Sequence, residues 1–326
     1  MGFHQNRQRR PPAYWKTSDG TLEFSRDSGM LLYYNSSHRV LPPGVTMTRA
    51  ADNSYTQGTD GLWVPASANT DRYGSGKLLI EPAITQLLNN DNTGGSVGTL
   101  PTYWDTLSSG TITATISVVG LGDADDELGL PYIDLKYLGS SSANGVISVF
   151  QNFGSASPVT RLNDYAYSYY AKVIAGSFPV GSTLGLATQE CSDPTTLIAG
   201  TLSNDNGTAP TASYARREFV VNPANVNCTH LRVSCRHVIV GAVSLDFTIR
   251  FAGPMLEKAS AASSPVINGT TAGTRNADVV DFSASSKYSA TNRTVIVNGA
   301  GTASTTANWD GSLSVGEYRS VSVYKV

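Results

Sequence analysis

Charge is scarce in this sequence of 326 residues. Asp, Glu, Lys and Arg make up 15% of the chain and the formal net charge is -2, whereas soluble domains usually carry about a quarter of charged residues. A near-neutral chain has no overall electrostatic attraction for nucleic acid or for an anionic membrane. Disorder usually goes with high net charge and few aromatics, but Phe, Trp and Tyr make up 9% here. We therefore expect a folded protein with an uncharged polar surface that binds neither nucleic acid nor membrane.

The sequence also lacks an even set of cysteines, a leader-like segment and any long apolar run. Its three cysteines, Cys191, Cys228 and Cys235, predict free thiols and synthesis in a reducing cytoplasm. Met1 is followed by polar and basic residues instead of the apolar stretch of a signal peptide. No run approaches the roughly 18 to 20 apolar residues that a membrane-spanning helix needs.

Helix signals are confined to one short segment, PAITQLLNN at residues 82–90. Ile84, Leu87 and Leu88 recur at helical spacing, and Pro82 suits a first helical turn. The preceding KLLIE, residues 77–81, is apolar enough for a short buried strand, which Pro82 would end because it has no N–H. We expect a strand at 77–81 followed by one or two helical turns that pack on something larger.

Alternating strand patterns dominate the rest of the chain. In residues 111–119, Ile112, Ala114, Ile116 and Val118 share one face. Similar patterns occur at 165–173 (with Tyr165, Tyr167 and Tyr169 on one face), 217–221, 230–240, 244–251, 293–299 and 316–326. Turn-forming clusters occur at 139–145, 203–210 and 222–225. Short alternating strands without helices between them predict an all-β protein built as an antiparallel jelly-roll β-sandwich.

Composition divides the chain into four zones. Residues 1–40 form an N-terminal arm and anchor, and 41–98 an irregular wrap that contains the short strand and helical turn. Residues 99–258 form the sandwich, and 259–326 a connector and a small C-terminal β extension.

Signatures of catalysis are missing. The sequence has no Gly-x-Ser-x-Gly elbow, no phosphate-binding glycine loop ending in Lys-Ser/Thr, no His-Glu-x-x-His and no Cys-x-x-Cys. We therefore expect a protein that is not an enzyme, with no catalytic residues and no cofactor.

Two clusters contain metal-ligand residue types. CTHLRVSCRH places Cys228, His230, Cys235 and His237 close together, but on a continuous strand the first two face away from the last two. A strand with Cys235 among core residues is therefore favoured over a zinc site.

The second cluster, GDADDELG, offers Asp123, Asp125, Asp126 and Glu127 in a loop. Its spacing is not that of an EF-hand. A solvated acidic turn is favoured, with a structural calcium site as the alternative, and no metal ligand is assigned.

Aromatic and basic residues leave two further alternatives open. Trp15, Trp63, Trp104 and Trp309 are either core or subunit contacts or platforms on which sugars stack. The three arginines of the N-terminal HQNRQRRPP are either solvated or anchor the arm on an acidic neighbour. These are Arg7, Arg9 and Arg10.

Several motifs occur in the order found in a family of tailed-bacteriophage virion proteins. Residues 42–88, from PPGVTMTRAADNSY through VPASANTDR to GKLLIEPAITQLL, resemble the opening of those proteins. YAYSYYAKVIAGS at 165–177 resembles a strand of the jelly roll that follows, which is similar to carbohydrate-binding modules. FAGPMLEKASAASSPVINGTTAGTRNADVV at 251–280 resembles the closing segment, whose Thr-Arg-x-Ala-Asp pattern also occurs at 48–52. Gln86, Met255 and Lys258-Ala259 depart from the family pattern.

This resemblance, which covers about residues 40–282, implies a non-enzymatic structural component displayed on the virion. The expected types are a capsid decoration, head-fibre or spike protein, and the alternative is a tail-fibre module that binds host glycans. The implied partners are other virion proteins, such as major capsid or tail proteins, together with further copies of this chain, a trimer being favoured. The arm at residues 1–12 would supply the anchor. A tailspike depolymerase would carry fixed-period β-helix repeats, which this sequence lacks.

Overall fold

The computed structural model divides the chain into two compact units. One unit comprises Met1–Ala51, Ser67–Pro82 and Ala277–Val326, and the other comprises Asp52–Ala66 and Ala83–Asn276. The structure describes residues 15–16, 22–23, 46–50, 53–58, 60–70, 72–74, 77–88, 95–267, 273–281, 292–299, 304–305 and 316–325. Every regular element within these ranges is a β-strand. None of the residues in these ranges forms a helix of the length and apolar character needed to cross a membrane.

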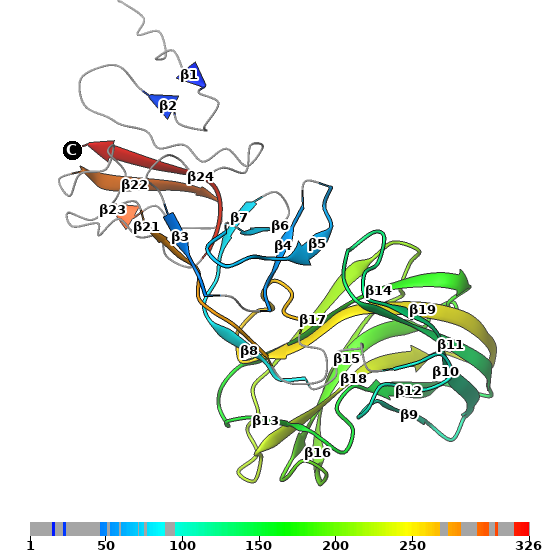
Figure 1. The fold of residues 1–326 in the computed structure, drawn as a ribbon. Coiled ribbons are helices and arrows are strands. Elements are labelled where there is room, and N and C mark those ends of the chain that lie inside the picture. Colours follow the sequence, from blue (N-terminus) through cyan, green and yellow to red (C-terminus); the bar gives the residue numbers. More distant parts are fainter. Residues whose placement is uncertain are drawn as a thin grey trace, which may run out of the picture. The chain divides into compact units, whose positions relative to one another are not determined.

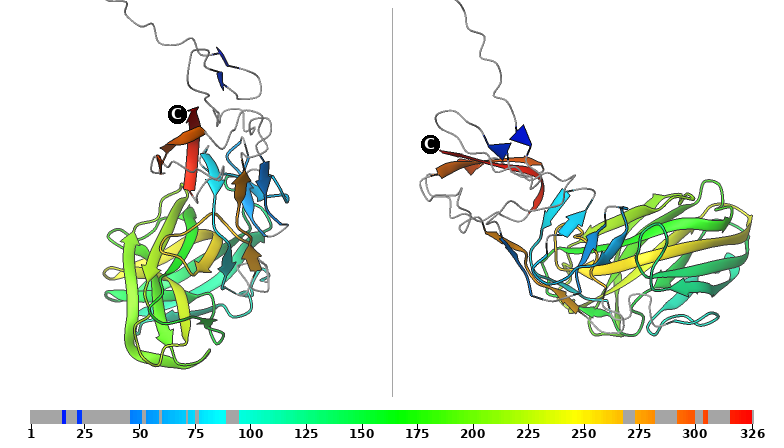
Figure 2. Two further views of the ribbon diagram at one scale, coloured as in Figure 1. Left: turned by 90° about the vertical axis from the view of Figure 1, so that its left-hand side faces the viewer. Right: turned by 45° about the horizontal axis from the view of Figure 1, so that its top comes forward.

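Two antiparallel sheets build the sandwich of the second unit (Figures 1 and 2). The seven-stranded sheet contains, in spatial order, β10 (Ile112–Gly122), β11 (Tyr132–Ser141), β19 (Val243–Glu257), β14 (Tyr165–Gly176) and β17 (Ala215–Val221), with β8 (Ile84–Gln86) and β20 (Gly273–Arg275) joined at the end of β19. The six-stranded sheet contains β16 (Leu197–Thr208), β15 (Thr183–Cys191), β18 (His230–Ile239), β12 (Gly145–Phe150) and β9 (Asp105–Ser108), with β13 (Ser157–Pro158) paired to β18. A separate hairpin joins β4 (Tyr55–Gln57) to β5 (Trp63–Pro65). The predicted all-β antiparallel sandwich is confirmed.

The sandwich core is held together by apolar packing and by tyrosine hydroxyls that reach across it. Tyr165, Tyr167 and Tyr169 are all buried, as their shared face in the sequence predicts. Tyr167 on β14 donates to Gln151 Oε1 at 2.7 Å, and Tyr169 donates to the Gly185 carbonyl at 2.8 Å. Each hydroxyl therefore finds a partner on the opposite side of the core, which removes the penalty for burying it.

The cluster at residues 203–210, predicted as a turn, is instead largely strand. β16 continues from Leu197 to Thr208 and pairs with β15, with register shifts that mark bulges. β16 is the edge strand of its sheet, so its Asn and Asp side chains remain exposed. The ladder to β15 outweighs their turn preference.

The helical turns predicted within residues 82–90 are wrong for residues 82–88, the part that the structure describes. Ile84–Gln86 forms β8, which pairs with β20 and with the end of β19. Ile84 packs against Met255 and Val266. Gln86 is fully buried, donates to the Pro254 carbonyl and accepts from Leu256 N. Its partners lie about 170 residues away in the sequence, so local spacing could not reveal them.

The first unit contains a five-stranded sheet ordered β23 (Ser304–Thr305), β22 (Asn292–Gly299), β24 (Gly316–Lys325), β7 (Lys77–Ile80) and β6 (Arg72–Gly74). β3 (Thr46–Thr48) pairs with β21 (Val279–Asp281), and β1 (Trp15–Lys16) pairs with β2 (Leu22–Glu23). The strands predicted at 77–81, 293–299 and 316–326 are therefore confirmed to within a residue or two at their ends.

A buried ion cluster joins distant segments of the first unit. Asp278 accepts hydrogen bonds from Arg49 NH1 and Arg72 Nε, each at 3.2 Å, and it also forms an ion pair with Arg72 NH2. Arg72 NH2 lies 2.7 Å from Glu81 Oε2, and Glu81 N donates to Asp278 at 3.0 Å. Burial acts to lower the pKa of Arg72, but the hydrogen bonds and charges of Asp278 and Glu81 outweigh it and raise the pKa. The cluster neutralises charges that would be costly to bury alone.

Candidate functional site

The acidic loop singled out in the sequence is engaged in ion pairs. Asp125 Oδ2 lies 2.6 Å from Arg250 NH1, and Asp125 Oδ1 accepts the backbone N–H groups of Glu127 and Leu128 at 2.8 and 3.0 Å. Glu127 Oε1 lies 2.7 Å from Lys172 Nζ. The loop therefore fastens to cations on the outer face of the seven-stranded sheet. In the described ranges, no group of three or more His, Cys, Asp or Glu residues is placed to hold a metal ion.

The Cys and His residues of CTHLRVSCRH are separated by the strand, as their alternation predicts. Cys235 and His237 lie in the core, where burial raises the pKa of the thiol to about 12 and lowers the pKa of the imidazole to about 3. His237 Nε2 lies 2.8 Å from Tyr137 Oη. Cys228, outside the strand, donates to the His230 carbonyl at 3.4 Å.

The other candidate residues lie either in the core or outside the described residues. Trp63 and Trp104 are buried, with 7% and 6% of their surface exposed, so neither offers a face to a ligand. Trp15 lies in β1, of which the structure describes only the backbone. Trp309 and the arginines at positions 7, 9 and 10 lie outside the described residues.

On the outer face of the seven-stranded sheet, cations are paired with carboxylates. Arg250 binds Asp134 with two parallel hydrogen bonds of 2.7 and 2.8 Å, and its guanidinium lies 3.7 Å from the centroid of the Tyr132 ring. Lys136 lies 3.2 Å from Asp246. The hydrogen bonds that Arg250 donates to Asp134 and Asp125 raise the pKa of its guanidinium, so its charge is fixed and neutralised.

The outer face of the six-stranded sheet is hollowed along β18. Directly paired residues of an antiparallel ladder point to the same face. Two such rows cross the sheet: Leu107, Ser148, Arg236 and Gly185 in one, and Asp105, Phe150, Ser234, Ala187 and Asn204 in the other. In a third row Arg232 stands opposite Gln189, which pairs in turn with Leu202. The small side chains of Ser234 and Ala187 therefore form a low floor between two arginines.

We call this hollow the face groove. Its volume is about 270 Å³, and its lining residues are Leu107, Val146, Ser148, Phe150, Ala187, Thr188, Gln189, Leu202, Arg232, Ser234 and Arg236. The lining combines apolar side chains with a few polar groups, as in most sites for small ligands.

Arg232 and Phe150 form one end of the face groove, and the ring of Phe153 lies beside Arg232 outside the lining. Its guanidinium lies 4.4 Å from the centroid of Phe150 and 5.4 Å from that of Phe153, and its NH2 donates to Gln189 Oε1 at 2.8 Å. Phe153 is 40% exposed. This ring therefore remains available for contact with the apolar face of a ligand.

Arg236 forms the other end and is positioned by a bulge in β16. A Cβ at Gly185, opposite Arg236, would lie 1.8 Å from the Asp205 carbonyl oxygen, so only glycine permits this approach. The pairing of β15 with β16 shifts register at this point. As a result Asn206 Oδ1 lies 2.6 Å from Arg236 NH1 and accepts its hydrogen bond.

Both arginines of the face groove keep an uncompensated charge. The lining contains no Asp or Glu, and neither guanidinium forms an ion pair within the described residues. Burial lowers the pKa of both groups, opposed at Arg232 by the negative charge of Asp105. An arginine remains protonated despite such shifts. The groove is therefore a cationic site with a polar and aromatic lining.

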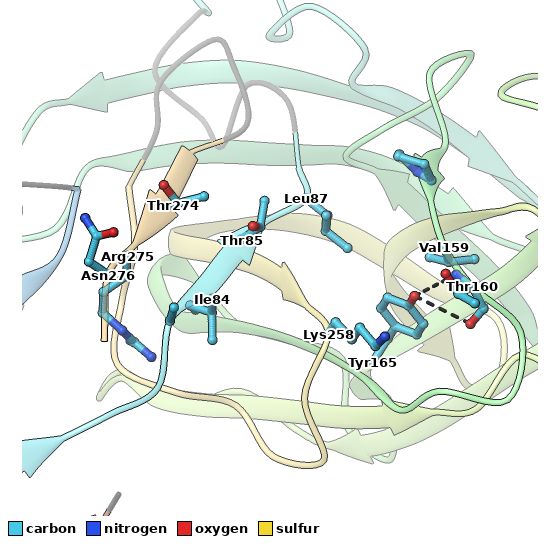
Figure 3. Close-up of a pocket in the computed structure, with 12 residues that line it drawn as sticks. Ile84, Thr85, Leu87, Val159, Thr160, Tyr165, Lys258, Thr274, Arg275 and Asn276 are labelled. Carbon is cyan, nitrogen blue, oxygen red and sulfur yellow. Dashed lines mark hydrogen bonds between the residues drawn. The ribbon is translucent and has the colours of Figure 1, made fainter. Parts of the chain in front are cut away.

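A larger cleft of about 590 Å³ lies beside β8 and β20 (Figure 3). Tyr165 lines it but is 2% exposed, and its hydroxyl accepts Thr160 N at 2.7 Å. Arg275 on β20 turns its guanidinium to Ser263 and Ser264. These side chains are engaged in holding the framework, so the face groove is the better candidate for ligand binding.

Sequence reasoning did not identify the face groove. The available signal was the alternation of Arg232, Ser234 and Arg236 with the core residues Leu231, Val233 and Cys235. Such a pattern shows that the arginines face outward. It does not show that Gln189, 43 positions away from Arg232, lies beside it.

A scan of protein-family models found no match to this sequence, and a search of curated proteins found none either.

Solved structures share parts of the fold at low identity. They include the enzymatically active domain of tailspike protein 4 of bacteriophage CBA120, with 12% identity over 48% of this chain and 19% of that chain, and a TM-score of 0.31. They also include the CBM22-1 xylan-binding domain of Xyn10C from Paenibacillus barcinonensis, with 12% identity over 56% and 99% of the two chains and a TM-score of 0.29. A carbohydrate-binding module of the β-sandwich superfamily, described as promiscuous in specificity, matches with 10% identity over 76% and 99% and a TM-score of 0.36. At these scores the similarity adds no argument about ligand or assembly.

Proposed function

We propose that this chain is a non-enzymatic structural component of a tailed-bacteriophage virion, displayed on the particle surface as a capsid decoration, head-fibre or spike protein. The observation that carries the proposal is the buried or largely buried location of five charged residues in the motifs that resemble such proteins. Arg49, Arg72, Glu81 and Asp278 bond one another in the first unit. Arg275 is fully buried in the second unit and bonds Ser264.

Buried charges make a sequence resemblance more telling than exposed ones do. A buried arginine or aspartate requires its partner, because removing one member of such a pair is strongly destabilising. Motifs that share these residues in the same order therefore point to a shared framework of contacts. This reasoning supports kinship with the virion proteins, which in turn supports the proposed role.

The proposal includes the assembly of the particle. The partners are major capsid or tail proteins and further copies of this chain, with a trimer favoured, and the basic arm with Arg7, Arg9 and Arg10 is the anchor. The chain is made in the host cytoplasm and ends in the virion.

Purified particles test this role directly. Mass spectrometry of particles from a phage that encodes this chain should find it at fixed stoichiometry, and antibodies against the sandwich should decorate intact particles. Deleting residues 1–12 should remove the chain from particles while leaving it soluble in the lysate. A chain absent from washed particles would refute the proposal, and unchanged occupancy of the truncated chain would refute the anchoring role alone.

A second candidate function, recognition of host glycans, is favoured by the face groove. The exposed Phe153 ring beside Arg232, the two arginines of the groove and the amides that hold them are groups that pack on sugar rings and bond their hydroxyls. A panel of host polysaccharides should show binding by the full chain. Ser148→Trp, which fills the groove, should abolish that binding without changing the unfolding midpoint. Flat titrations across the panel would exclude this function.

A further inference from the structure

The two arginines of the face groove lie on one strand and on one face, with Ser234 between them. Arg236 follows Arg232 by four steps along the strand, so their backbones lie about 13 Å apart. Arg232 Nε is buried and has no hydrogen-bond partner among the described residues. Asp105 stands in the row of Phe150 and acts on Arg232 through space, without an ion pair. The site thus has two separate, unneutralised cationic points.

Amide groups orient these guanidinium groups but do not neutralise them. Gln189 holds Arg232 and Asn206 holds Arg236, each through one amide oxygen. An arginine fixed in this way keeps further N–H donors for a ligand, and it matches the planar geometry of a carboxylate or phosphate. Because the guanidinium is already positioned, less side-chain entropy is lost when an anion binds.

We propose that the face groove binds an acidic polysaccharide, whose anionic groups contact Arg232 and Arg236 while a sugar ring packs near Phe153. This inference rests on the glycan-binding role proposed above and names its ligand class. Because their backbones lie about 13 Å apart and their guanidinium groups are held by different residues, Gln189 and Asn206, the two arginines suit two anionic groups on different residues of an extended chain. The shared chemistry is a carboxylate or a phosphate ester on the sugar backbone.

A single-stranded nucleic acid fits the groove less well. Such ligands are held by a cationic groove that follows the backbone and by several rings on which successive bases stack. The face groove offers two cations, and Phe150, 7% exposed, is covered by Arg232, so Phe153 is the ring of this pair left open. Its floor consists of the small residues Ser234 and Ala187.

Isothermal titration of the full chain with four probes tests the inference: hexagalacturonate, a wall teichoic acid fragment, maltohexaose and the oligonucleotide dT12. We expect hexagalacturonate or the teichoic acid to bind, and the probe that binds distinguishes a carboxylate from a phosphate ligand. Raising the ionic strength from about 0.05 to about 0.3 M should weaken binding through screening. Arg232→Gln and Arg236→Gln should each weaken it about tenfold.

Variants that keep both arginines but neutralise them test whether their uncompensated charge is what binds the ligand. Gln189→Glu and Asn206→Asp keep both arginines but give each a carboxylate partner, and each should weaken binding of the acidic probe to a similar extent. Lys136→Gln removes one positive charge from the outer face of the other sheet and should leave affinity within about twofold, since an exposed charge at that distance is screened. Unfolding midpoints confirm that each variant is folded.

Three results would overturn the inference. If maltohexaose binds as tightly as the acidic probes and the arginine variants do not matter, the groove binds glycans without selecting anions, and the glycan-binding role survives. If dT12 binds most tightly, the groove is a nucleic-acid site. If no probe binds, both the acidic-ligand inference and the glycan-binding role fail, while the virion proposal is unaffected.

Discussion

The two outer faces of the sandwich hold their cations in opposite ways. On the seven-stranded sheet, Arg250 is bound by Asp134 and Asp125, and Lys136 pairs with Asp246. On the six-stranded sheet, Arg232 and Arg236 are held by the neutral amides of Gln189 and Asn206. A carboxylate neutralises a cation and fixes its position, whereas an amide orients it without neutralising its charge. The first face is therefore built for stability, and the second leaves charge available to a ligand.

Removing one carboxylate from the first face should have the largest effect on folding. Asp134→Asn breaks the two parallel bonds to Arg250 and should lower the free energy of unfolding by about 2 kcal/mol, less than for a fully buried pair because Arg250 is partly exposed and keeps Asp125. Urea denaturation measures the change. Arg236→Gln on the second face is the control and should stay within about 0.5 kcal/mol. Equal losses would show that both faces depend on their cations in the same way.

Acid should weaken the first face and leave the charge of the second intact. Burial acts to raise the pKa of Asp125, but hydrogen bonds from Arg250 and from the N–H groups of Glu127 and Leu128 outweigh it and lower the pKa below 3.8. The stabilisation is therefore complete above the unfolded-state pKa of about 4 and is lost as the pH falls through the lower folded-state pKa. Unfolding midpoints measured between about pH 6 and pH 2.5 should decrease as the pH is lowered. Asp125→Asn should make the midpoint depend less steeply on pH. An unchanged slope in the variant would contradict the role of Asp125.

The aromatic rings beside Arg232 and Arg250 should also differ, one contributing to ligand binding and the other to stability. Phe153→Ala should weaken binding of an acidic oligosaccharide severalfold, equivalent to about 1 kcal/mol, with little loss of stability because the ring is partly exposed. Tyr132→Ala, which removes the ring over Arg250, should lower stability and leave binding unchanged. Titration and urea denaturation of both variants give the comparison. The opposite pattern would reverse the assignment of the faces.

The smallest effect is expected for the exposed pair on the first face. Lys136 and Asp246 have side chains that are 39% and 66% exposed. Asp246→Asn should therefore change the free energy of unfolding by less than about 0.5 kcal/mol, because solvent and salt screen such pairs. A loss as large as that of Asp134→Asn would show that carboxylate pairing matters on this face regardless of burial.

Elements whose partners are close in sequence, or whose faces alternate clearly, could be predicted. The face shared by Tyr165, Tyr167 and Tyr169 follows from period-two alternation alone, and so does the inward position of Cys235. The strand at Ile84–Gln86 could not be predicted, because its residues match helical spacing and β20 lies far along the chain.

Of the candidate site, only the outward-facing residues of one strand could be predicted from the sequence. Arg232 and Arg236 face outward by alternation, but the amides that hold them come from β15 and β16. The approach of Asn206 depends on a bulge opposite Gly185. Neither a pairing register nor a bulge is encoded in local composition.

The pairing of β8 with β20 has a consequence for the order in which the chain assembles. Ile84 stands opposite Arg275, 191 positions later (275 minus 84). Closing a loop of that length costs conformational entropy once, and the cost grows only slowly with length. Folding of the sandwich already includes this entropy cost. Glu81 and Asp278 lie three residues outside the paired positions in the sequence, so bringing them together costs little further conformational entropy. Residues 83–276 are synthesised before residues 277–326, and domains generally fold as units, N-terminal first. Completion of the first unit then becomes a local step at the end of synthesis.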